Sequence, residues 1–364
     1  MRNAGLDILR FIAVFLVLGR HLQVCPSTQS RVWHDISTVW HRGGWVGVDL
    51  FFVLSGYLIS GLLFKELIQY GTIKPGLFLI RRGFKIYPPF WVFIASTVLF
   101  FNLHSINLKK LFVELFFVQN YFWGYWQHTW SLAVEEHFYF GLVFLLFFLT
   151  TNSKREGVKS VPYLFFVIAV CCLLFRVLTF FFYAEFNYMK QLYATHLRID
   201  SLMFGVFLSY LNHFHKNLSL FRWPTWCFIV TGVVLLSPAF IFSLETSSFI
   251  PVFGVVLFYL GGGCLVLAFS RIKKSGHPII YVISSLGAAS YSIYLWHAMI
   301  IEKGTERLFT VVGWGPYMIC SIVGALVFGF FMHRIVEVPS LAIRDKVFPA
   351  RRFQEKPTEN DKRV

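Results

Sequence analysis

The stretch RFIAVFLVLGRH, residues 10–21, is apolar enough for the interior of a membrane-spanning helix, yet it begins with Arg10 and ends with Arg20 and His21. In an α-helix, the eleven-residue step from Arg10 to His21 advances by about 16 Å and returns to almost the same face. These two side chains are therefore expected on one stripe, three turns apart. Arg20 points about 100° away from His21, and we expect it to reach the lipid headgroups. A helix that only spans the bilayer does not need such a stripe.

The composition of the whole chain extends this picture. Of the 364 residues, 57% are hydrophobic, 20% are aromatic and 14% are charged, and the mean hydropathy is +0.63. A soluble domain carries roughly 25% charged residues, so the composition predicts a polytopic membrane protein. The net charge of +15 does not indicate a nucleic-acid partner, because the cations fall between apolar segments, as topology signals do.

The cysteines and the first apolar segment exclude two other kinds of organisation. The six cysteines are scattered, mostly inside apolar runs, and show neither a CxxC pair nor a metal-binding spacing. We therefore expect no disulfide framework and no metal site. A cleaved signal peptide is not expected either, because the first segment contains Asp7 and Arg10 and lacks a small-residue exit site.

Hydropathy divides the chain into about ten candidate transmembrane helices, each needing about 20 apolar residues. The all-α prediction places them at 6–23, 45–64, 84–103, 130–150, 161–183, 193–212, 224–244, 250–270, 286–301 and 314–337. The apolar run 111–123 is too short to span and is predicted to be re-entrant or interfacial. With both termini in the cytoplasm, inside loops hold 21 Lys and Arg residues and outside loops hold seven, as the positive-inside rule requires. Residues 1–344 thus form one transmembrane domain, and the charged tail 345–364 is predicted to be disordered.

Ionisable residues within or beside these spans sort by depth. On this topology the inner boundary receives a mostly basic set, namely Asp7, Arg10, Arg81, Arg82, Lys85, Arg334 and Glu337. The outer half receives histidines, carboxylates and two arginines, namely His21, Asp49, Glu135, Glu136, His137, Arg176, Arg198, Asp200 and His297. Intramembrane charges are costly and commonly functional. This arrangement is expected if an anionic ligand binds from the cytoplasm and acid–base chemistry takes place nearer the outside.

An ordered set of motifs runs through the spans. After Arg10-x10-His21 come GGWVGVDLFFVLSGYLIS (43–60), FLIRRGFKIYPPFW (78–91), HTWSLAVEEHFYF (128–140), RIDSLMFGVFLSY (198–210), SYSIYLWH (290–297) and VEVPS (336–340). In this order they resemble the acyltransferase-3 family of integral-membrane O-acyltransferases, over roughly 5–340. The chain departs from the family at Lys85, where a second arginine is frequent, and at His137, where glutamine is more usual.

The resemblance implies a catalytic set of His21, Glu135 and Arg10. His21 would act as a general base on a hydroxyl that attacks a thioester, because imidazole exchanges protons readily near neutral pH. It could alternatively carry the acyl group itself. Glu135 would orient the histidine, stabilise its charge or bind acceptor hydroxyls. Arg10 would bind the anionic donor, or pair with Glu337 or Asp7.

Further roles are implied for residues around this set. The cations Arg81, Arg82 and Lys85 would bind the phosphates of acyl-CoA, although any cytoplasmic loop can be basic for topology alone. Supporting or acceptor-binding roles are implied for Asp49, Ser55, Trp130, Asp200, Tyr294, His297 and Glu337. Ion pairs with arginines explain the two aspartates equally well, close helix packing explains the serine, and an interfacial belt explains the aromatics.

The predicted function is that of a multi-pass O-acyltransferase in the bacterial inner membrane. Acyl-CoA, above all acetyl-CoA, is the expected donor substrate, and no permanently bound cofactor is expected. The expected acceptor is a hydroxyl of a cell-envelope glycan, such as a lipopolysaccharide O-antigen, an exopolysaccharide or a lipid-linked sugar, and membrane lipids are the other partners. The alternative is a proton-coupled secondary transporter or acyl-group exporter, because intramembrane His, Asp, Glu and Arg also build proton relays.

Overall fold

The computed structural model describes residues 3–101, 106–153, 156–183, 185–272 and 276–350, so most of the predicted tail lies outside the described residues. The part of the chain that is described is helical and contains no β-strand, in agreement with the all-α prediction. The α-helices are α1 (Ala4–His21), α2 (Arg31–Gly43), α3 (Gly47–Tyr70), α4 (Pro75–Phe101), α5 (Leu108–Leu115), α6 (Trp130–Ser153), α7 (Val161–Phe182), α8 (Thr195–Phe214), α9 (Thr225–Leu236), α10 (Pro238–Ile241), α11 (Val255–Ser270), α12 (Pro278–Ala288), α13 (Ser290–Ala298), α14 (Glu306–Val312), α15 (Trp314–Met332) and α16 (Val338–Val347).

Shorter helical turns connect these helices. Four are 3₁₀ turns, namely η1 (Gly44–Val46), η2 (Gln127–Thr129), η3 (Glu156–Ser160) and η5 (Ser219–Arg222). Four have π geometry, namely η4 (Met189–Tyr193), η6 (Ile250–Gly254), η7 (Met299–Thr305) and η8 (His333–Glu337). Two of the π segments, η7 and η8, adjoin functional candidates described below, which is a frequent location for π geometry.

Within the described residues, six helical segments are long and apolar enough to cross a membrane, and a seventh is added if a bent pair counts as one span. The six are Arg31–Tyr70, Pro75–Phe101, Gln127–Thr151, Glu156–Phe182, Ile250–Ser270 and Trp314–Val347, and the pair Pro278–Ala288 and Ser290–Glu302 is bent by 64°. Three other predicted spans form helices that are short or carry intramembrane charges: α1, α8 and α9. The count of ten spans and the orientation of the termini stay predictions.

α1 lies at the centre and is held along its length by close backbone contacts. A methyl group on Gly287 of α12 would lie 1.8 Å from the carbonyl oxygen of Asp7, and one on Gly44 of η1 would lie 2.3 Å from that of Leu16. Glycine is therefore needed at both crossings. These contacts fix the position of α1, and with it the positions of Arg10 and His21.

α3 and α8 cross at a reciprocal pair of glycines. A Cβ atom on Gly56 would lie 1.9 Å from the carbonyl oxygen of Leu202, and one on Gly205 would lie 2.1 Å from that of Val53. Small residues allow helix backbones to approach this closely in membrane proteins. Ser55-Gly56, which the sequence associates with close packing, thus lies at a tight helix crossing.

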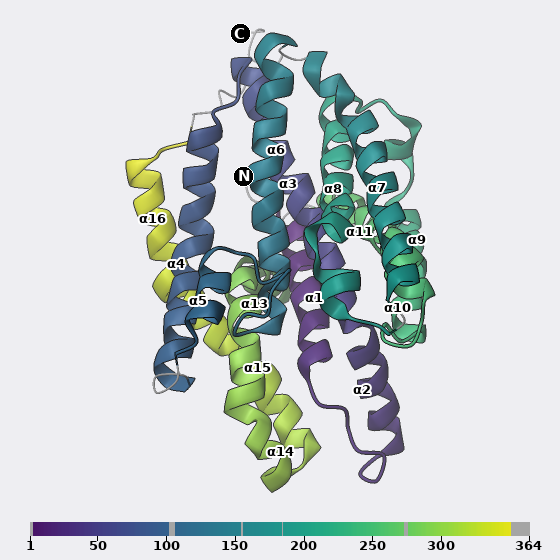
Figure 1. Ribbon diagram of the computed structural model, residues 1–364, viewed down its shortest axis with the longest axis vertical. Coiled ribbons are helices and arrows are strands. Elements are labelled where there is room, and N and C mark those ends of the chain that lie inside the picture. Colours follow the sequence, from purple (N-terminus) through teal and green to yellow (C-terminus); the bar gives the residue numbers. More distant parts are fainter. Residues whose placement is uncertain (1–2, 102–105, 154–155, 184, 273–275, 351–364) are drawn as a thin grey trace.

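Figure 1 shows how the helices are arranged around α1. α3 and α13 contact α1, and α6 contacts α3. α4 and the yellow α16 lie side by side at one edge, whereas α7, α9 and α11 lie toward the opposite edge. α2, α14 and α15 extend from one end of the molecule. The site described next is formed by the central helices together with α4.

Candidate active site

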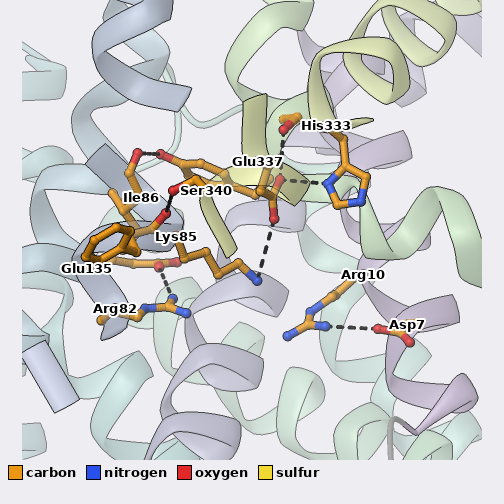
Figure 2. A network of polar contacts seen from close by, with 12 residues as sticks. Asp7, Arg10, Arg82, Lys85, Ile86, Glu135, His333, Glu337 and Ser340 are labelled. Atoms are coloured by element: carbon orange, nitrogen blue, oxygen red, sulfur yellow. Dashed lines mark hydrogen bonds and ion pairs between the residues drawn. The ribbon is translucent and has the colours of Figure 1, made fainter. Parts of the chain in front are cut away.

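Three basic side chains from α1 and α4 face one cavity among the central helices. Arg10, Arg82 and Lys85 line it, and Glu135 of α6 lines it with them. Figure 2 shows the three cationic groups directed toward a common space. We call this the central cavity; its lining also includes Val48, Phe51, Ser55, Glu136, Tyr291 and Tyr294. A partly buried space with three cations attracts an anionic group.

Glu135 belongs to a compact polar cluster in this cavity. Its carboxylate lies 3.8 Å from the guanidinium of Arg82 and accepts a hydrogen bond from the hydroxyl of Tyr139. Tyr139 also accepts a hydrogen bond from Arg82, whose guanidinium carbon lies 4.4 Å from the tyrosine ring centre. Ser55 completes the cluster, with its Oγ 2.6 Å from the tyrosine oxygen. The predicted residues Glu135, Ser55 and Arg82 are thus brought together.

Glu337, at the end of η8, is buried and positions Lys85. It accepts hydrogen bonds from Ser292 at 2.8 Å and interacts with Nδ1 of His333 at 2.9 Å, and its other oxygen lies 4.0 Å from Nζ of Lys85. Figure 2 shows these contacts converging on the carboxylate. Arg10 pairs with the other partner that the sequence offered, Asp7, at 2.9 Å.

A second cavity, here called the basic cavity, adjoins the central one. It is lined by Ile59, Leu62, Leu63, Glu66, Leu77, Phe78, Arg81, Arg82, Lys85, Arg344 and Ala350. Arg82 and Lys85 line both cavities. Arg81 binds Asp345 of α16 at 2.8 Å and the carbonyl of Phe348. The three predicted phosphate-binding cations therefore line one cavity, and α16 is fastened beside it.

His21 lines a third cavity, on the other side of the central one. This histidine cavity is lined by Val17, Arg20, His21, His41, Trp45, Val48, Gln127, His128, Trp130, Tyr188, Leu192, Tyr193, Leu244 and Tyr294. Val48 and Tyr294 line both the central and the histidine cavity. Arg10 and His21, three turns apart on α1, therefore lie in two adjoining cavities.

The carboxylate beside His21 is that of Glu302, in η7. Nδ1 of His21 lies 3.6 Å from Oε1 of Glu302, whereas Glu135 interacts with Arg82 in the central cavity. Two more imidazoles surround His21, with ring centres 4.7 Å away for His297 and 6.2 Å away for His128. Among the described residues, no group of His, Cys, Asp and Glu side chains is arranged to hold a metal ion.

The two neighbouring imidazoles have defined hydrogen bonds. Nε2 of His128 donates to the carbonyl of Leu295 at 3.1 Å, and Nδ1 of His297 donates to the carbonyl of Tyr294. The hydroxyl of Tyr294 in turn donates to the carbonyl of His128 at 2.7 Å and accepts from Ser131 at 2.6 Å. These bonds fix the rings and the tyrosine at the boundary between the central and histidine cavities.

Arg20 contacts protein groups at the end of α1. It donates to Glu245, in the loop after α10, at 2.5 Å and to the hydroxyl of Tyr188 at 2.8 Å. Partial burial favours a raised pKa for Glu245, but hydrogen bonds from Ser243, Tyr188 and Arg20 outweigh it and lower the pKa to about 2. The C-terminal end of α1 is thus anchored beside His21.

Asp49 and Asp200 form buried ion pairs with arginines, one of the two readings that the sequence left open. Asp49 lies 2.6 Å from Arg198, and Asp200 lies 2.8 Å from Arg176. Trp130 stacks on a tyrosine of the histidine cavity, with ring centres 4.4 Å apart. The aspartates therefore hold α3, α7 and α8 together, while Trp130 lines the site.

Three residues of the site were not singled out from the sequence. Tyr139 lies one turn after Glu135, and this i, i+4 spacing was a usable signal. His128 opens the quoted motif 128–140, but only the structure shows that it approaches His21. Glu302 gave no local signal, because its approach to His21 depends on the bend after α12 and on the π geometry of η7.

Comparison with known proteins agrees with these features. The model of a family described as an acyltransferase domain matches residues 3–334. The peptidoglycan O-acetyltransferase OatA of Listeria monocytogenes is 27% identical over 84% of this chain and 50% of its own length, and the O-acetyltransferase OatA of Staphylococcus aureus strain NCTC 8325 is 27% identical over 96% and 58%. Another protein, from S. aureus strain COL, is 28% identical over 92% and 56%.

The chain therefore spans about half the length of the curated relatives it matches. No solved structure matches it. The family match covers nearly all of the described residues and includes the central, basic and histidine cavities apart from the α16 side. The chain belongs to the acyltransferase-3 family.

Proposed function

We propose that the protein transfers an acetyl group from cytoplasmic acetyl-CoA to a hydroxyl of a cell-envelope glycan. The observation that carries this proposal is the row of three adjoining cavities. The basic cavity shares Arg82 and Lys85 with the central cavity, which shares Val48 and Tyr294 with the histidine cavity. A row of this kind leads from a phosphate-binding surface to a candidate base.

In this proposal the basic cavity binds the phosphates of the coenzyme. The guanidinium groups of arginine and the ammonium group of lysine both bind phosphate oxygens. The carboxylate of Glu337 keeps Lys85 directed toward the central cavity. The thioester arm extends past Arg10 toward Tyr294. The coenzyme is a substrate here, and no permanently bound cofactor takes part.

The chemistry takes place in the histidine cavity. The carboxylate of Glu302 faces Nδ1 of His21 and favours the tautomer that is protonated there, which leaves Nε2 to accept the proton of the acceptor hydroxyl. The hydroxyl oxygen forms a bond to the acetyl carbonyl carbon, the carbon–sulfur bond breaks, and the proton passes to the departing thiolate. If the acetyl group first binds His21 itself, the same atoms are exchanged in two steps.

The proposal also specifies the acceptor and the orientation of the cavities across the membrane. The two OatA relatives carry O-acetyltransferase in their names, and one of them is named for peptidoglycan, which supports an envelope glycan as the acceptor. Ten spans in the inner membrane, with both termini in the cytoplasm, would place the basic cavity on the cytoplasmic side and His21 near the opposite surface of the membrane. The donor and the acceptor would then approach from opposite sides.

Acetyl transfer can be measured with the full chain in lipid nanodiscs, with radiolabelled acetyl-CoA as donor and envelope glycans from cells lacking the gene as acceptor. His21→Ala should abolish labelling of the glycan while the protein still inserts and retains its thermal transition. The matched control is His137→Gln, because His137 contacts Thr195 and lines none of the three cavities. Full labelling by His21→Ala would contradict the proposal.

The transporter or exporter alternative predicts a different signal. Such a protein would move protons together with its substrate and would release no thiol from acetyl-CoA. A thiol-reactive dye and a pH-sensitive dye in the same proteoliposomes separate the two functions. We expect acceptor-dependent thiol release without proton flux.

A further inference from the structure

A fourth pocket lies beside the histidine cavity. It is lined by Thr97, Phe101, Lys110, Trp123, Gly124, Tyr125, Trp126, Gln127 and Glu302. We call it the aromatic pocket. Gln127 lines both this pocket and the histidine cavity, and Glu302 is the carboxylate 3.6 Å from His21. The aromatic pocket therefore adjoins the cavity of the proposed base and shares no lining residue with the central cavity.

Two aromatic side chains of the lining are exposed. Trp123 is 57% exposed and Phe101 is 45% exposed. α5 adds a one-sided helix, with Val113 and Glu114 buried and the residues Leu108, Phe112 and Leu115 exposed. A short helix of this kind is suited to lie in the membrane interface. The pocket thus opens where lipid, rather than only water, is expected.

The pocket is built by specific contacts and does not depend on a loose loop. Oε1 of Glu114 accepts hydrogen bonds from the backbone N–H groups of Tyr125 at 2.8 Å and Trp126 at 3.2 Å. The indole N–H of Trp126 donates to Thr97 of α4 at 2.8 Å. A side chain on Gly124 would lie 2.3 Å from the same carboxylate oxygen. The aromatic segment is therefore held against α4 and α5 before any ligand binds.

The lining combines groups that suit different parts of one molecule. Trp123 and Tyr125 offer aromatic faces with a polar edge, which suit the apolar face and hydroxyls of a sugar ring. Lys110, on the interfacial helix, supplies a cation for a phosphate oxygen. Phe101, which is partly exposed, extends the lining toward lipid. Glu302 marks the end at which a sugar hydroxyl would meet His21.

We infer that the aromatic pocket receives the acceptor as a lipid-linked saccharide, in which a sugar is joined through phosphate to a membrane-embedded chain. The phosphate binds Lys110, the lipid chain lies along Phe101, and the sugar extends toward Gln127 and His21. This inference rests on the proposed function and specifies its substrate class. A water-soluble polysaccharide would use the aromatic faces but gain nothing from the lysine or the lipid-facing rim.

The first test compares two acceptors that differ only in the lipid phosphate. Lipid-linked saccharides are extracted from cells lacking the gene, and half are released from their lipid phosphate by mild acid. The full chain in nanodiscs is given radiolabelled acetyl-CoA and either preparation. We expect kcat/KM for the released saccharide to be at least tenfold lower. Equal values would overturn the inference, whereas no labelling of either preparation would contradict the proposed function.

The second test uses two neighbouring lysines. Lys110 lines the pocket, but Lys109 does not and is exposed. Lys110→Ala should raise KM for the lipid-linked acceptor about tenfold, which corresponds to the loss of one charge-assisted contact, while KM for acetyl-CoA is unchanged. Lys109→Ala should leave both constants unchanged. Equal effects of the two substitutions, or a change in the donor KM alone, would overturn the assignment of Lys110.

Discussion

Nδ1 of His21 and Oε1 of Glu302 lie 3.6 Å apart, although they come from the first helix and from a π segment near the end of the chain. In the proposed reaction this carboxylate orients the imidazole and stabilises the positive charge that it acquires. The role resembles that of the third member of a catalytic triad, which acts on the base and not on the substrate.

Glu302→Gln should therefore lower kcat for acetyl transfer by at least about tenfold, because part of the general-base contribution of His21, typically about 10²- to 10⁴-fold, is lost. The donor KM should change little, since Glu302 does not line the basic or central cavity. Steady-state kinetics over a range of pH checks this, because a positioning role also displaces the pH profile. An unchanged profile and kcat would show that Glu302 does not act on His21.

Arg82 and Arg81 should have separable effects on donor binding. Arg82 lines both the basic and the central cavity, whereas Arg81 is bonded to Asp345 and Phe348. Removing a charged hydrogen-bonding group costs about 1.5–3 kcal/mol, so Arg82→Ala should raise KM for acetyl-CoA about 10- to 100-fold.

Arg82→Lys should recover only part of the lost donor affinity, because the lysine ammonium cannot form the two parallel hydrogen bonds that a guanidinium gives to a phosphate. Arg81→Ala should raise the donor KM less and should make residues 345–348 more sensitive to limited proteolysis. The measurements are donor titrations at saturating acceptor and a timed digest. A larger KM effect at Arg81 than at Arg82 would contradict this view of the two arginines.

The crossing of α3 and α8 predicts a stability difference between two glycines. Gly56→Ala places a methyl group 1.9 Å from the carbonyl oxygen of Leu202 and should destabilise the protein by about 1–3 kcal/mol through overpacking. Gly141→Ala in α6 meets no neighbouring atom within 4 Å and should be neutral or stabilising, by up to about 1 kcal/mol. Thermal unfolding in detergent measures both. Equal transition temperatures for the two variants would contradict the close crossing.

The carboxyl group of Glu114 should make the stability of the protein depend on pH in a way that the Glu114→Gln variant does not show. Burial raises the pKa of this carboxyl to about 7, although hydrogen bonds from Trp126, Thr129 and Tyr125 act in the opposite direction. Because the folded-state pKa lies above the ordinary value of 4.5, the unfolded chain loses this proton at a lower pH than the folded protein does. Its stabilising contribution should therefore fall as pH rises from about 4.5 to about 7.

The measurement is the melting temperature of the wild type and of Glu114→Gln between pH 4.5 and 8. The melting temperature of Glu114→Gln should rise relative to that of the wild type as pH rises to about 7, and the difference should then stay constant. A constant difference throughout would show that Glu114 does not titrate in this range.

The helical class and the composition of the basic cavity could be read from the sequence, because both depend on local signals. Apolar runs identify helices regardless of their neighbours, and Arg81, Arg82 and Lys85 are close in the chain, so one helix brings them to one cavity. The stripe from Arg10 to His21 follows from helical periodicity alone. These features need no knowledge of how the helices pack.

The partners of these residues depend on packing and could not be read in the same way. Glu135 and Glu302 are both carboxylates near histidine-containing motifs, and the bend of 64° after α12 determines which of them approaches His21. Likewise, the residue types of Asp49 and Asp200 suit catalysis or ion pairing, and only the packing of α8 against α3 and α7 places them beside Arg198 and Arg176. Long-range geometry, more than residue type, decided these assignments.

Tyr294 and Val48 stand at the junction of the central and histidine cavities, and this junction determines what powers the proposed reaction. In the proposed reaction the acetyl group passes it in one direction and the hydroxyl proton passes it in the other, an exchange without net charge, while the coenzyme and the glycan stay on their own sides. The acetyl group then crosses the membrane because free energy is released when a thioester becomes an ester, and the membrane potential contributes nothing to this free energy. Acetylation should continue at an unchanged rate in vesicles whose membrane potential has been collapsed by an ionophore.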